Sequence, residues 1–330
     1  MTFKNEVFSL WIGPRLSILE QTCINSFLEK GIVFILYIYN NLENVPQGTV
    51  IRDANTVILE EEYSKYDNPS YFSNLFRYTL LYELGGIWVD MDLVCIQPID
   101  LSSEYIFSSE LKNDEQHTNA GIIGCPPKTT LMYDCKQEVQ NIVHSKQSIK
   151  HGQLGPKVLK KYVSKHELEH YVLPPYVFCY YGFREVHTIF TSIINHIDEL
   201  EDATCIHLWN NVLSKEGIDK TVPLKNTLYD NLTSLYTQTT TINVTYKAHR
   251  TQEQSTLNLS VNSIFVAYSE AEAFSLKQQN PSSYIVLIKK RVNAFLVYCN
   301  KLNTHVYEYT DKIILEEQSK FNILKSVLKK

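Results

Sequence analysis

Two carboxylates interrupt an apolar stretch between residues 87 and 96. We expect this stretch to be one strand, with Asp90 and Asp92 near its carboxyl end. Residues two apart on a strand point to the same side, and ionised carboxylates in an apolar setting need a cation or hydrogen-bond donors. Paired carboxylates suit Mg²⁺ or Mn²⁺. The pair therefore predicts a divalent-metal site, while the plainer interpretation is two solvated residues at a strand end.

A predicted helix over residues 71–84 precedes this strand, because its leucine and phenylalanine residues fall on one stripe. It carries Asn74 and Arg77, and Gly85-Gly86 ends it. Arg77 precedes Asp90 by thirteen residues. A lone arginine on a helix is usually solvated or salt-bridged, but the order of helix, Gly-Gly break and carboxylate pair makes Arg77 a candidate for the same site.

The segments around this region alternate between strand and helix patterns. Strands are predicted at residues 7–12, 32–39, 49–53 and 119–125. A capping-box pattern at Ser17 and Glu20 begins a helix that ends at Gly31. Nearly continuous apolar strands in this order predict an α/β fold with a mostly parallel sheet flanked by helices. Such sheets bind nucleotides at the carboxyl edge of their strands.

These residues and their order resemble the DxD-containing sugar-transfer glycosyltransferases. That family of GT-A (Rossmann-like) fold includes capsular polysaccharide synthesis enzymes, fungal-type mannosyltransferases and clostridial glucosylating toxins. The resemblance covers about residues 7–215 and includes Val45-Pro46, Asp53-Ala54 and His207-Leu208-Trp209. It implies a metal-dependent (Mn²⁺ or Mg²⁺) hexosyltransferase that uses a UDP- or GDP-linked sugar and a glycan or other hydroxyl acceptor. It also implies retention at the anomeric carbon and a role in surface polysaccharide or glycoconjugate synthesis.

The resemblance also implies roles for single residues. Asp92 would bind the metal, Asp90 would hold the ribose and help to position the metal, and His207 would complete the metal–diphosphate site. The implied catalytic residues are Arg77, Asp90 and Asp92, and the implied donor-binding residues are Trp11, Ile12, Asn74, Arg77, Asp90, Met91 and Asn119. The family usually has aspartate where this chain has Asn74. An amide keeps hydrogen-bonding capacity but carries no charge, so the departure bears on sugar preference.

The length of 330 residues predicts two domains, a catalytic domain over residues 1–236 and a small α+β accessory domain over 237–330. From Tyr236 onward the net charge is +5, whereas the rest of the chain carries −10. An acidic body argues against nucleic-acid binding. The accessory domain is expected to end in a basic amphipathic helix from about Ile313. This helix either packs on its own domain or makes a peripheral membrane contact.

The expected location is cytoplasmic, with a peripheral position at the inner face of the membrane as the alternative, because no apolar run of about 20 residues and no leader pattern is found. Two other functions stay open. One is a catalytically silent nucleotide-sugar-binding module, with Asn74 as the lesion. The other is a haloacid-dehalogenase-like phosphatase, which also places D-x-D after a strand but near the start of the chain.

Overall fold

The structure, a computed structural model, describes residues 3–66, 68–145, 148–150, 152–193, 200, 202–237 and 240–247, together with five short strands between residues 256 and 309. The chain divides into two compact units, residues 1–39 with 44–242 and residues 40–43 with 243–330. All residues that the sequence suggested for the site lie in the first unit. No helix in the described part of the chain is long and apolar enough to cross a membrane.

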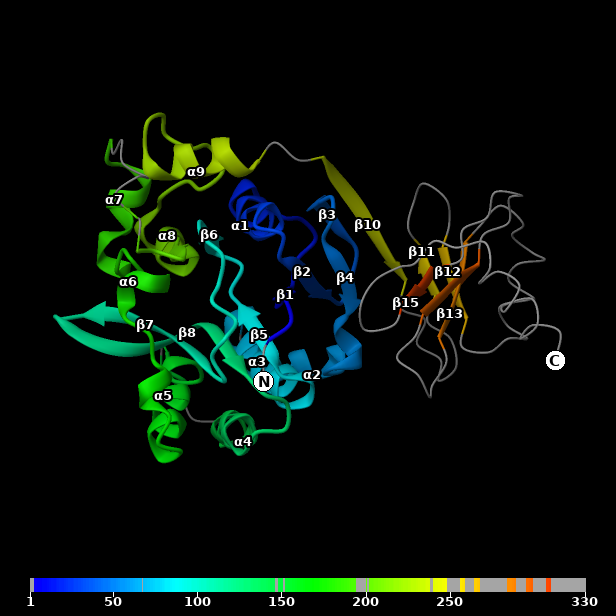
Figure 1. Ribbon diagram of the computed structural model, residues 1–330, viewed down its shortest axis with the longest axis horizontal. Helices are drawn as coiled ribbons and strands as arrows, with labels where there is room; N and C mark the ends of the chain where they lie inside the picture. Colours follow the sequence, from blue (N-terminus) through cyan, green and yellow to red (C-terminus); the bar gives the residue numbers. More distant parts are fainter. Residues whose placement is uncertain are drawn as a thin grey trace. The chain divides into compact units, whose positions relative to one another are not determined.

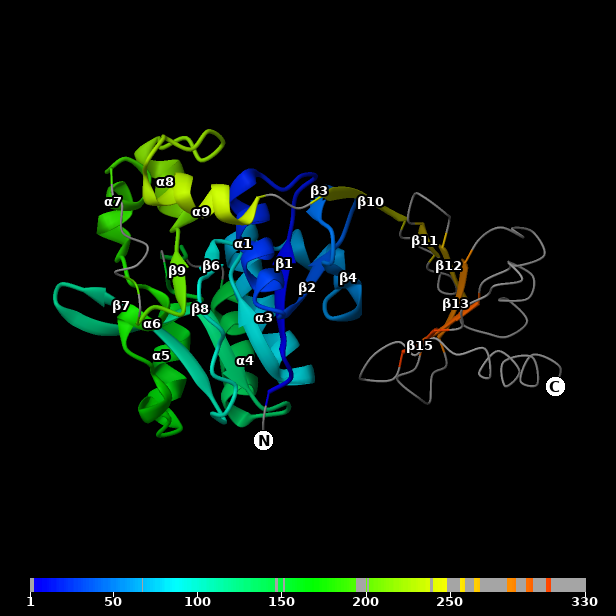
Figure 2. The ribbon, with the colours of Figure 1, turned by 45° about the horizontal axis from the view of Figure 1, so that its top comes forward.

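A six-stranded sheet forms the centre of the first unit, in the order β4-β2-β1-β5-β8-β7. The strands β1 (Glu6–Trp11), β2 (Val33–Ile38), β4 (Val50–Asp53) and β5 (Gly86–Val89) are parallel. The strands β8 (Glu115–Cys125) and β7 (Ile106–Lys112) form an antiparallel hairpin at one edge, with β8 antiparallel to β5 (Figures 1 and 2). The predicted mostly parallel α/β sheet is confirmed.

Helices cover both faces of this sheet. On one face lies α1 (Ile18–Glu29), whose Phe27 ring contacts Phe34 of β2, with ring centroids 5.6 Å apart. On the other lies α3 (Pro69–Leu84), whose Phe76 contacts Tyr37 of β2 at 5.6 Å. Alternate residues of a strand point to opposite faces, so an apolar strand such as β2 packs against helices on both sides. The capping box is present, with Ser17 N–H donating to Glu20 Oε2 at 2.7 Å.

The turn between α3 and β5 requires two glycines. Gly85 has φ of +64° and Gly86 has φ of +92°, which is backbone that residues with a side chain rarely adopt. A Cβ at Gly85 would also lie 2.5 Å from Pro127 N, and one at Gly86 would lie 2.6 Å from Phe8 Cε2. The Gly-Gly break therefore brings α3 back directly onto the strand that leads to Asp90.

The strand predicted over residues 87–96 is two strands. β5 ends at Val89, Asp90 and Asp92 lie in the connection, and β6 (Leu93–Cys95) pairs with β9 (Cys205–His207) in a second sheet. The expectation that both carboxylates lie on one strand was therefore wrong. A change of pairing partner explains the break. Asp90 N–H still donates to Gly121 O of β8 (2.8 Å), but the residues that follow leave β8 and pair with β9 as strand β6.

The remaining elements of the first unit are mostly helical. α4 (Thr130–His144) and α5 (Pro156–Lys165) pack beside α3, and α9 (Leu228–Tyr236) packs on α1. The short elements are η1 (Ala54–Thr56), α2 (Glu60–Tyr63), η2 (Glu169–Tyr171), α6 (Pro175–Phe178), η3 (Phe183–Glu185), α7 (Val186–Phe190) and α8 (Asn210–Glu216). The division between the two units falls within β3 (Leu42–Pro46).

The second unit is described through its strands. The strands β12 (Ile264–Ala267), β13 (Tyr284–Ile288), β14 (Phe295–Tyr298) and β15 (Tyr307–Tyr309) form one sheet in that order. β10 (Thr241–Lys247) pairs with β11 (Thr256–Asn258). The basic helix expected from about Ile313 lies outside the described residues.

Candidate active site

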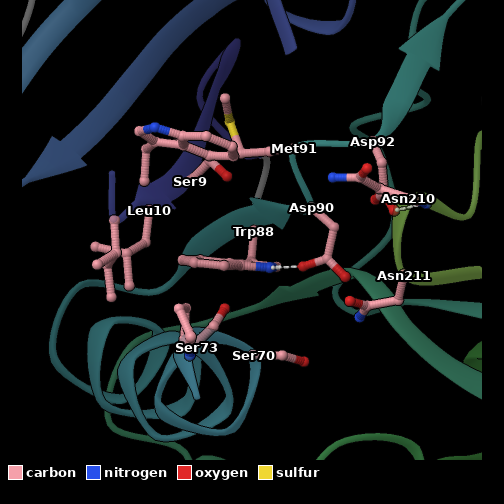
Figure 3. A pocket seen from close by; sticks show the side chains of 13 residues that line it. Ser9, Leu10, Ser70, Ser73, Trp88, Asp90, Met91, Asp92, Asn210 and Asn211 are labelled. Atoms are coloured by element: carbon pink, nitrogen blue, oxygen red, sulfur yellow. Dashed lines mark hydrogen bonds between the residues drawn. The ribbon is translucent and has the colours of Figure 1, made fainter. Parts of the chain in front are cut away.

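A cavity of about 270 Å³ opens at the carboxyl end of β1 and β5. The ends of these strands and the starts of α3 and α8 supply its walls (Figure 3). The lining residues are Ser9, Leu10, Trp11, Ile12, Pro69, Ser70, Ser73, Trp88, Asp90, Met91, Asp92, Asn210 and Asn211. Five of the residues suggested by the sequence therefore meet at one cavity: Trp11, Ile12, Asp90, Met91 and Asp92.

Asp90 is held from below by α3 and β5. Arg77 Nη2 lies 2.9 Å from Asp90 Oδ1, and the Trp88 indole N–H donates to the same oxygen at 2.8 Å. The Arg77 guanidinium also lies 5.1 Å from the centre of the Trp88 ring, within cation–π range. Burial raises the pKa of Asp90 above its usual value, and the Arg77 charge reduces this rise without cancelling it.

Every N–H donor of the Arg77 guanidinium contacts an acceptor within the protein. Its Nε donates to Ser73 O (3.5 Å), Nη2 to Ser73 Oγ (3.3 Å) and to Asp90, and Nη1 to Asp90 Oδ2 (3.4 Å) and Ala120 O. A guanidinium has five N–H donors, and these contacts account for all five. Arg77, whose side chain is only 7% exposed, is not among the cavity-lining residues, and its guanidinium is positioned to fix Asp90.

Asp92 is held from above by β9 and α8. His207 Nε2 lies 3.2 Å from Asp92 Oδ1, and the Asn210 N–H donates to Asp92 Oδ2 at 2.9 Å. Burial favours a raised pKa for Asp92, but the His207 charge and the hydrogen bonds from His207 and Asn210 hold that pKa below its usual value. Burial in turn opposes the charged imidazole, yet the Asp92 carboxylate raises the pKa of His207 well above its ordinary value.

Trp209 makes the turn that aims the Asn210 N–H at Asp92. Its backbone is left-handed, with φ of +54° and ψ of +48°, which is strained for a bulky residue. Two contacts hold it there. Its indole N–H donates to Tyr181 O (2.8 Å), and its ring stacks on His207 with centroids 3.9 Å apart.

The remaining suggested donor residues lie beside the cavity or away from it. Trp11 lines the cavity, and its buried indole N–H is one of two buried side-chain polar atoms without a partner in the described part of the chain. Asn74 does not line the cavity, because its amide donates to Ser70 O (2.7 Å) one turn earlier in α3. A Cβ at Gly155 would lie 2.5 Å from Asn74 Oδ1, so Asn74 packs directly against α5's first turn.

Asn119 lies on β8, two residues before Gly121, whose carbonyl accepts from Asp90 N–H at 2.8 Å. Its Oδ1 accepts from Gly121 N–H at 2.7 Å and from Ser108 Oγ at 3.4 Å. A Cβ at Gly121 would lie 2.9 Å from Asn119 Oδ1 and 3.5 Å from His207 Cε1. Because Gly121 has no side chain, Asn119 and His207 can both lie close to its backbone.

Two carboxylates of the cavity are available as ligands for a metal ion. The side chains of Asp90 and Asp92 are 26% and 16% exposed and both line the cavity. Among the described residues, no group of three histidine, cysteine, aspartate or glutamate side chains is placed to hold a metal. Such a pair fits a hard cation that takes its other ligands from water and phosphate oxygens.

Sequence reasoning missed several residues of the site. Ser73 is one turn before Arg77 on α3, so helical spacing indicates it. Asn210 and Asn211 directly follow His207-Leu208-Trp209, where a polar pair after a strand is a usable signal. The capping box indicated Glu20, but no local pattern indicated its second role, in which Glu20 Oε1 accepts from Asn210 Nδ2 (3.4 Å) and from Lys220 Nζ (2.6 Å), 200 residues away.

A protein-family comparison matches residues 19–111 to the family described as "Glycosyltransferase sugar-binding region containing DXD motif". The match includes Arg77, Asp90 and Asp92 and is narrower than the resemblance over residues 7–215. Residues 19–111 are thus similar to the DXD-containing sugar-binding region of glycosyltransferases, which supports the resemblance stated from the sequence. No curated protein matches the sequence.

Solved glycosyltransferases also resemble the structure at low identity. The PaToxG glycosyltransferase is 13% identical with a TM-score of 0.38, covering 50% of this chain and 69% of that one. The ligand-free glycosyltransferase domain of the YGT toxin is 9% identical with a TM-score of 0.38, covering 58% and 83%. GlyE from Streptococcus pneumoniae TIGR4 is 12% identical with a TM-score of 0.40, covering 86% and 74%. The similarity of this chain to glycosyltransferases therefore rests on the family match over residues 19–111.

Proposed function

We propose that the chain is a metal-dependent hexosyltransferase that moves a sugar from a UDP- or GDP-linked donor to a hydroxyl of a glycan. The observation that carries this proposal is that both aspartates of the DXD motif line one cavity at the carboxyl edge of the parallel strands. Nucleotides bind at this edge in open α/β sheets. The resemblance to the family adds retention at the anomeric carbon and a role in surface polysaccharide or glycoconjugate synthesis.

The cavity offers separate places for the parts of a nucleotide sugar. Trp11 and Ile12 lie at the end of β1, and the exposed part of the Trp11 indole is available to stack on a base. Ser70 and Ser73 line the opposite wall from α3 and can donate to hydroxyl or phosphate oxygens. Asp90 lies between these walls, where it can accept from the ribose hydroxyls.

Asp92 and Asp90 would hold Mn²⁺ or Mg²⁺ at this cavity. A divalent ion there would neutralise the charge that develops on the departing diphosphate. His207 contacts Asp92 directly, so we propose that it orients this carboxylate, as partners of metal ligands commonly do. Arg77 similarly orients Asp90, since its donors are all used within the protein.

A donor screen tests the proposal. The protein is incubated with Mn²⁺ and each common UDP- or GDP-linked sugar, and released nucleotide is measured with and without a chelator. We expect one donor to be turned over, and the chelator to stop the reaction. Turnover that continues at the same rate in the chelator would contradict the metal dependence.

Two further measurements, donor binding and phosphate release, separate the two alternative functions. Tight donor binding in calorimetry without nucleotide release, across all donors and acceptors, would indicate a silent binding module. Release of inorganic phosphate from sugar phosphates, with no need for a nucleotide, would indicate a phosphatase.

A further inference from the structure

Glu20 is a fully buried carboxylate whose two oxygens have separate partners. Ser17 N–H and Ser17 Oγ both donate to Oε2, which completes the capping box at the start of α1. Oε1 accepts from Asn210 Nδ2 at 3.4 Å and from Lys220 Nζ at 2.6 Å. Because the capping box uses only Oε2, capping of α1 does not account for the contacts of Oε1.

Asn210 connects Glu20 to the candidate metal site. Its side-chain amide donates to Glu20, and its backbone N–H donates to Asp92 Oδ2 at 2.9 Å. Asn210 also lines the cavity beside Asp92 (Figure 3), whereas Glu20 does not line it. Glu20 is thus separated from Asp92 by one residue, and a shift of Asn210 relative to Glu20 would also move the N–H that contacts Asp92.

Lys220 lies in the loop between α8 and α9 and is held at both ends. Its backbone carbonyl accepts from the hydroxyl of Tyr229, a buried residue of α9, at 2.7 Å. Its ammonium contacts Glu20, and its side chain is only 25% exposed. A buried carboxylate is costly without a paired cation, so Lys220 stabilises the charged form of Glu20 and fixes the position of Oε1.

We propose that Glu20 and Lys220 are positioning residues for the metal site. They hold Asn210 where its N–H keeps the Asp92 carboxylate in the geometry that binds Mn²⁺ or Mg²⁺. Residues that contact a metal ligand commonly set metal affinity, and here the contacting residue is itself held by a buried ion pair. The inference rests on the proposed function, because it assigns further residues to the same site.

The sign of the effect separates positioning from a simple effect of charge. If Glu20 and Lys220 acted on the metal through their charges alone, loss of the Glu20 anion would weaken Mn²⁺ binding and loss of the Lys220 cation would strengthen it. If both residues act by holding Asn210, loss of either one should weaken Mn²⁺ binding.

Glu20→Gln is the most selective variant. Glutamine can keep an oxygen on Ser17, as capping boxes allow, and it then turns an NH₂ group toward the donors of Asn210 and Lys220. Mn²⁺ binding by the full chain is measured by electron paramagnetic resonance, with and without UDP or GDP. We expect Glu20→Gln to weaken Mn²⁺ binding by roughly threefold to tenfold, less than the loss of about 10–100-fold that follows removal of a ligand's direct partner.

Lys220 is tested by variants that lose or keep the cation. Lys220→Met should weaken Mn²⁺ binding by a similar factor to Glu20→Gln, and Lys220→Arg should bind Mn²⁺ as the wild type does. The double variant Glu20→Gln/Lys220→Met should lose no more Mn²⁺ affinity than the weaker-binding single variant, because both changes act on the same Asn210 contact.

Two controls separate positioning from a general loss of stability. Thr129→Ala removes the N-cap of α4, so it should lower Tm and leave Mn²⁺ binding unchanged. Lys161→Met removes an exposed lysine that pairs with Glu138, and it should also leave Mn²⁺ binding unchanged. If Glu20→Gln fails to fold by circular dichroism, Lys220→Met and Lys220→Arg decide the question.

Two outcomes would overturn the inference while leaving the proposed function in place. One is that the folded Glu20→Gln and Lys220→Met variants bind Mn²⁺ as the wild type and the controls do. The other is that the two variants change Mn²⁺ affinity in opposite directions, which would indicate an effect of charge alone. A wild-type protein that binds no Mn²⁺, with or without UDP or GDP, would instead contradict the proposed metal dependence itself.

Discussion

Asp90 and Asp92 are two residues apart, yet the residues that contact their carboxylates come from distant parts of the sequence. Asp90 is held by Arg77 and Trp88, which belong to α3 and β5. Asp92 is held by His207 and the Asn210 N–H, which come from β9 and α8 more than 110 residues later in the chain. The pKa of Asp90 is raised and that of Asp92 is lowered.

The difference shows that a charged partner alone does not decide the state of a buried carboxyl. Asp90 has a permanent cation beside it, but burial, together with the negative charge of Asp92, outweighs the attraction. Asp92 is also buried, but a backbone N–H and an imidazole both stabilise its charged form. Asp92 is thus the better preorganised anion, which agrees with its proposed place as the direct metal ligand.

The largest effect is expected from removing the cation beside Asp90. Arg77→Met leaves the Asp90 carboxylate with only the Trp88 N–H, so the free energy of unfolding should fall by about 3–5 kcal/mol. Urea unfolding followed by circular dichroism measures this. Arg184→Met, which changes an exposed arginine, should have little effect. A loss below about 1 kcal/mol in Arg77→Met would show that the ion pair is not what holds Asp90.

The next largest effect concerns Asp92. Asp92→Asn keeps the shape of the side chain but removes its charge, so nucleotide release with Mn²⁺ should fall by about 10²–10³-fold. Asp134→Asn is the matched control, because Asp134 is paired with Lys165 and His166 on the surface of α4 and α5. Turnover within threefold of wild type in Asp92→Asn would contradict the proposed role.

A smaller effect is expected from changing Trp209, because it stacks on His207 and directly precedes Asn210, and these two residues hold Asp92. Trp209→Phe keeps a ring next to His207 but loses the hydrogen bond to Tyr181 O, and this should cost about 0.5–1.5 kcal/mol of stability. Trp209→Gly relieves the left-handed backbone and removes the ring. If the ring positions Asn210 and Asp92, Trp209→Gly should lose more nucleotide release than Trp209→Phe, and equal rates would argue against this.

The smallest effect is expected at Glu138, a half-buried carboxylate whose partner Lys161 is exposed. The Lys161 ammonium, 2.8 Å away, holds the pKa of Glu138 below its usual value. A lowered folded pKa adds stability above the unfolded pKa of about 4.3, and this stability is lost as pH falls through the folded pKa. Glu138→Gln should therefore lower Tm slightly at pH 7, by an amount worth about 0–1 kcal/mol, and not at pH 3. An equal Tm difference at both pH values would contradict this.

Local patterns predicted much of the first unit. The Ser17–Glu20 capping box, the Gly-Gly break and the apolar strands each depend on neighbours in sequence, and the structure has them. The position of the DXD motif at a strand end was also predictable. The division of the apolar stretch at residues 87–96 into β5 and β6 was not predictable, because β6 forms only by pairing with β9, 112 residues away.

Long-range contacts explain what sequence reasoning missed at the site. Arg77 was expected to reach the donor, but its donors meet Ser73, Ala120 and Asp90, and only the folded β8 brings Ala120 there.

The missing side chain at Gly121 leaves space for two neighbours at once. A methyl group there would press on Asn119 and would come into van der Waals contact with His207, which contacts Asp92. A single added carbon, on a residue that does not line the cavity, would thus disturb the surroundings of a cavity-lining carboxylate. Any redesign of this part of β8 is therefore limited first by the space next to the Gly121 Cα.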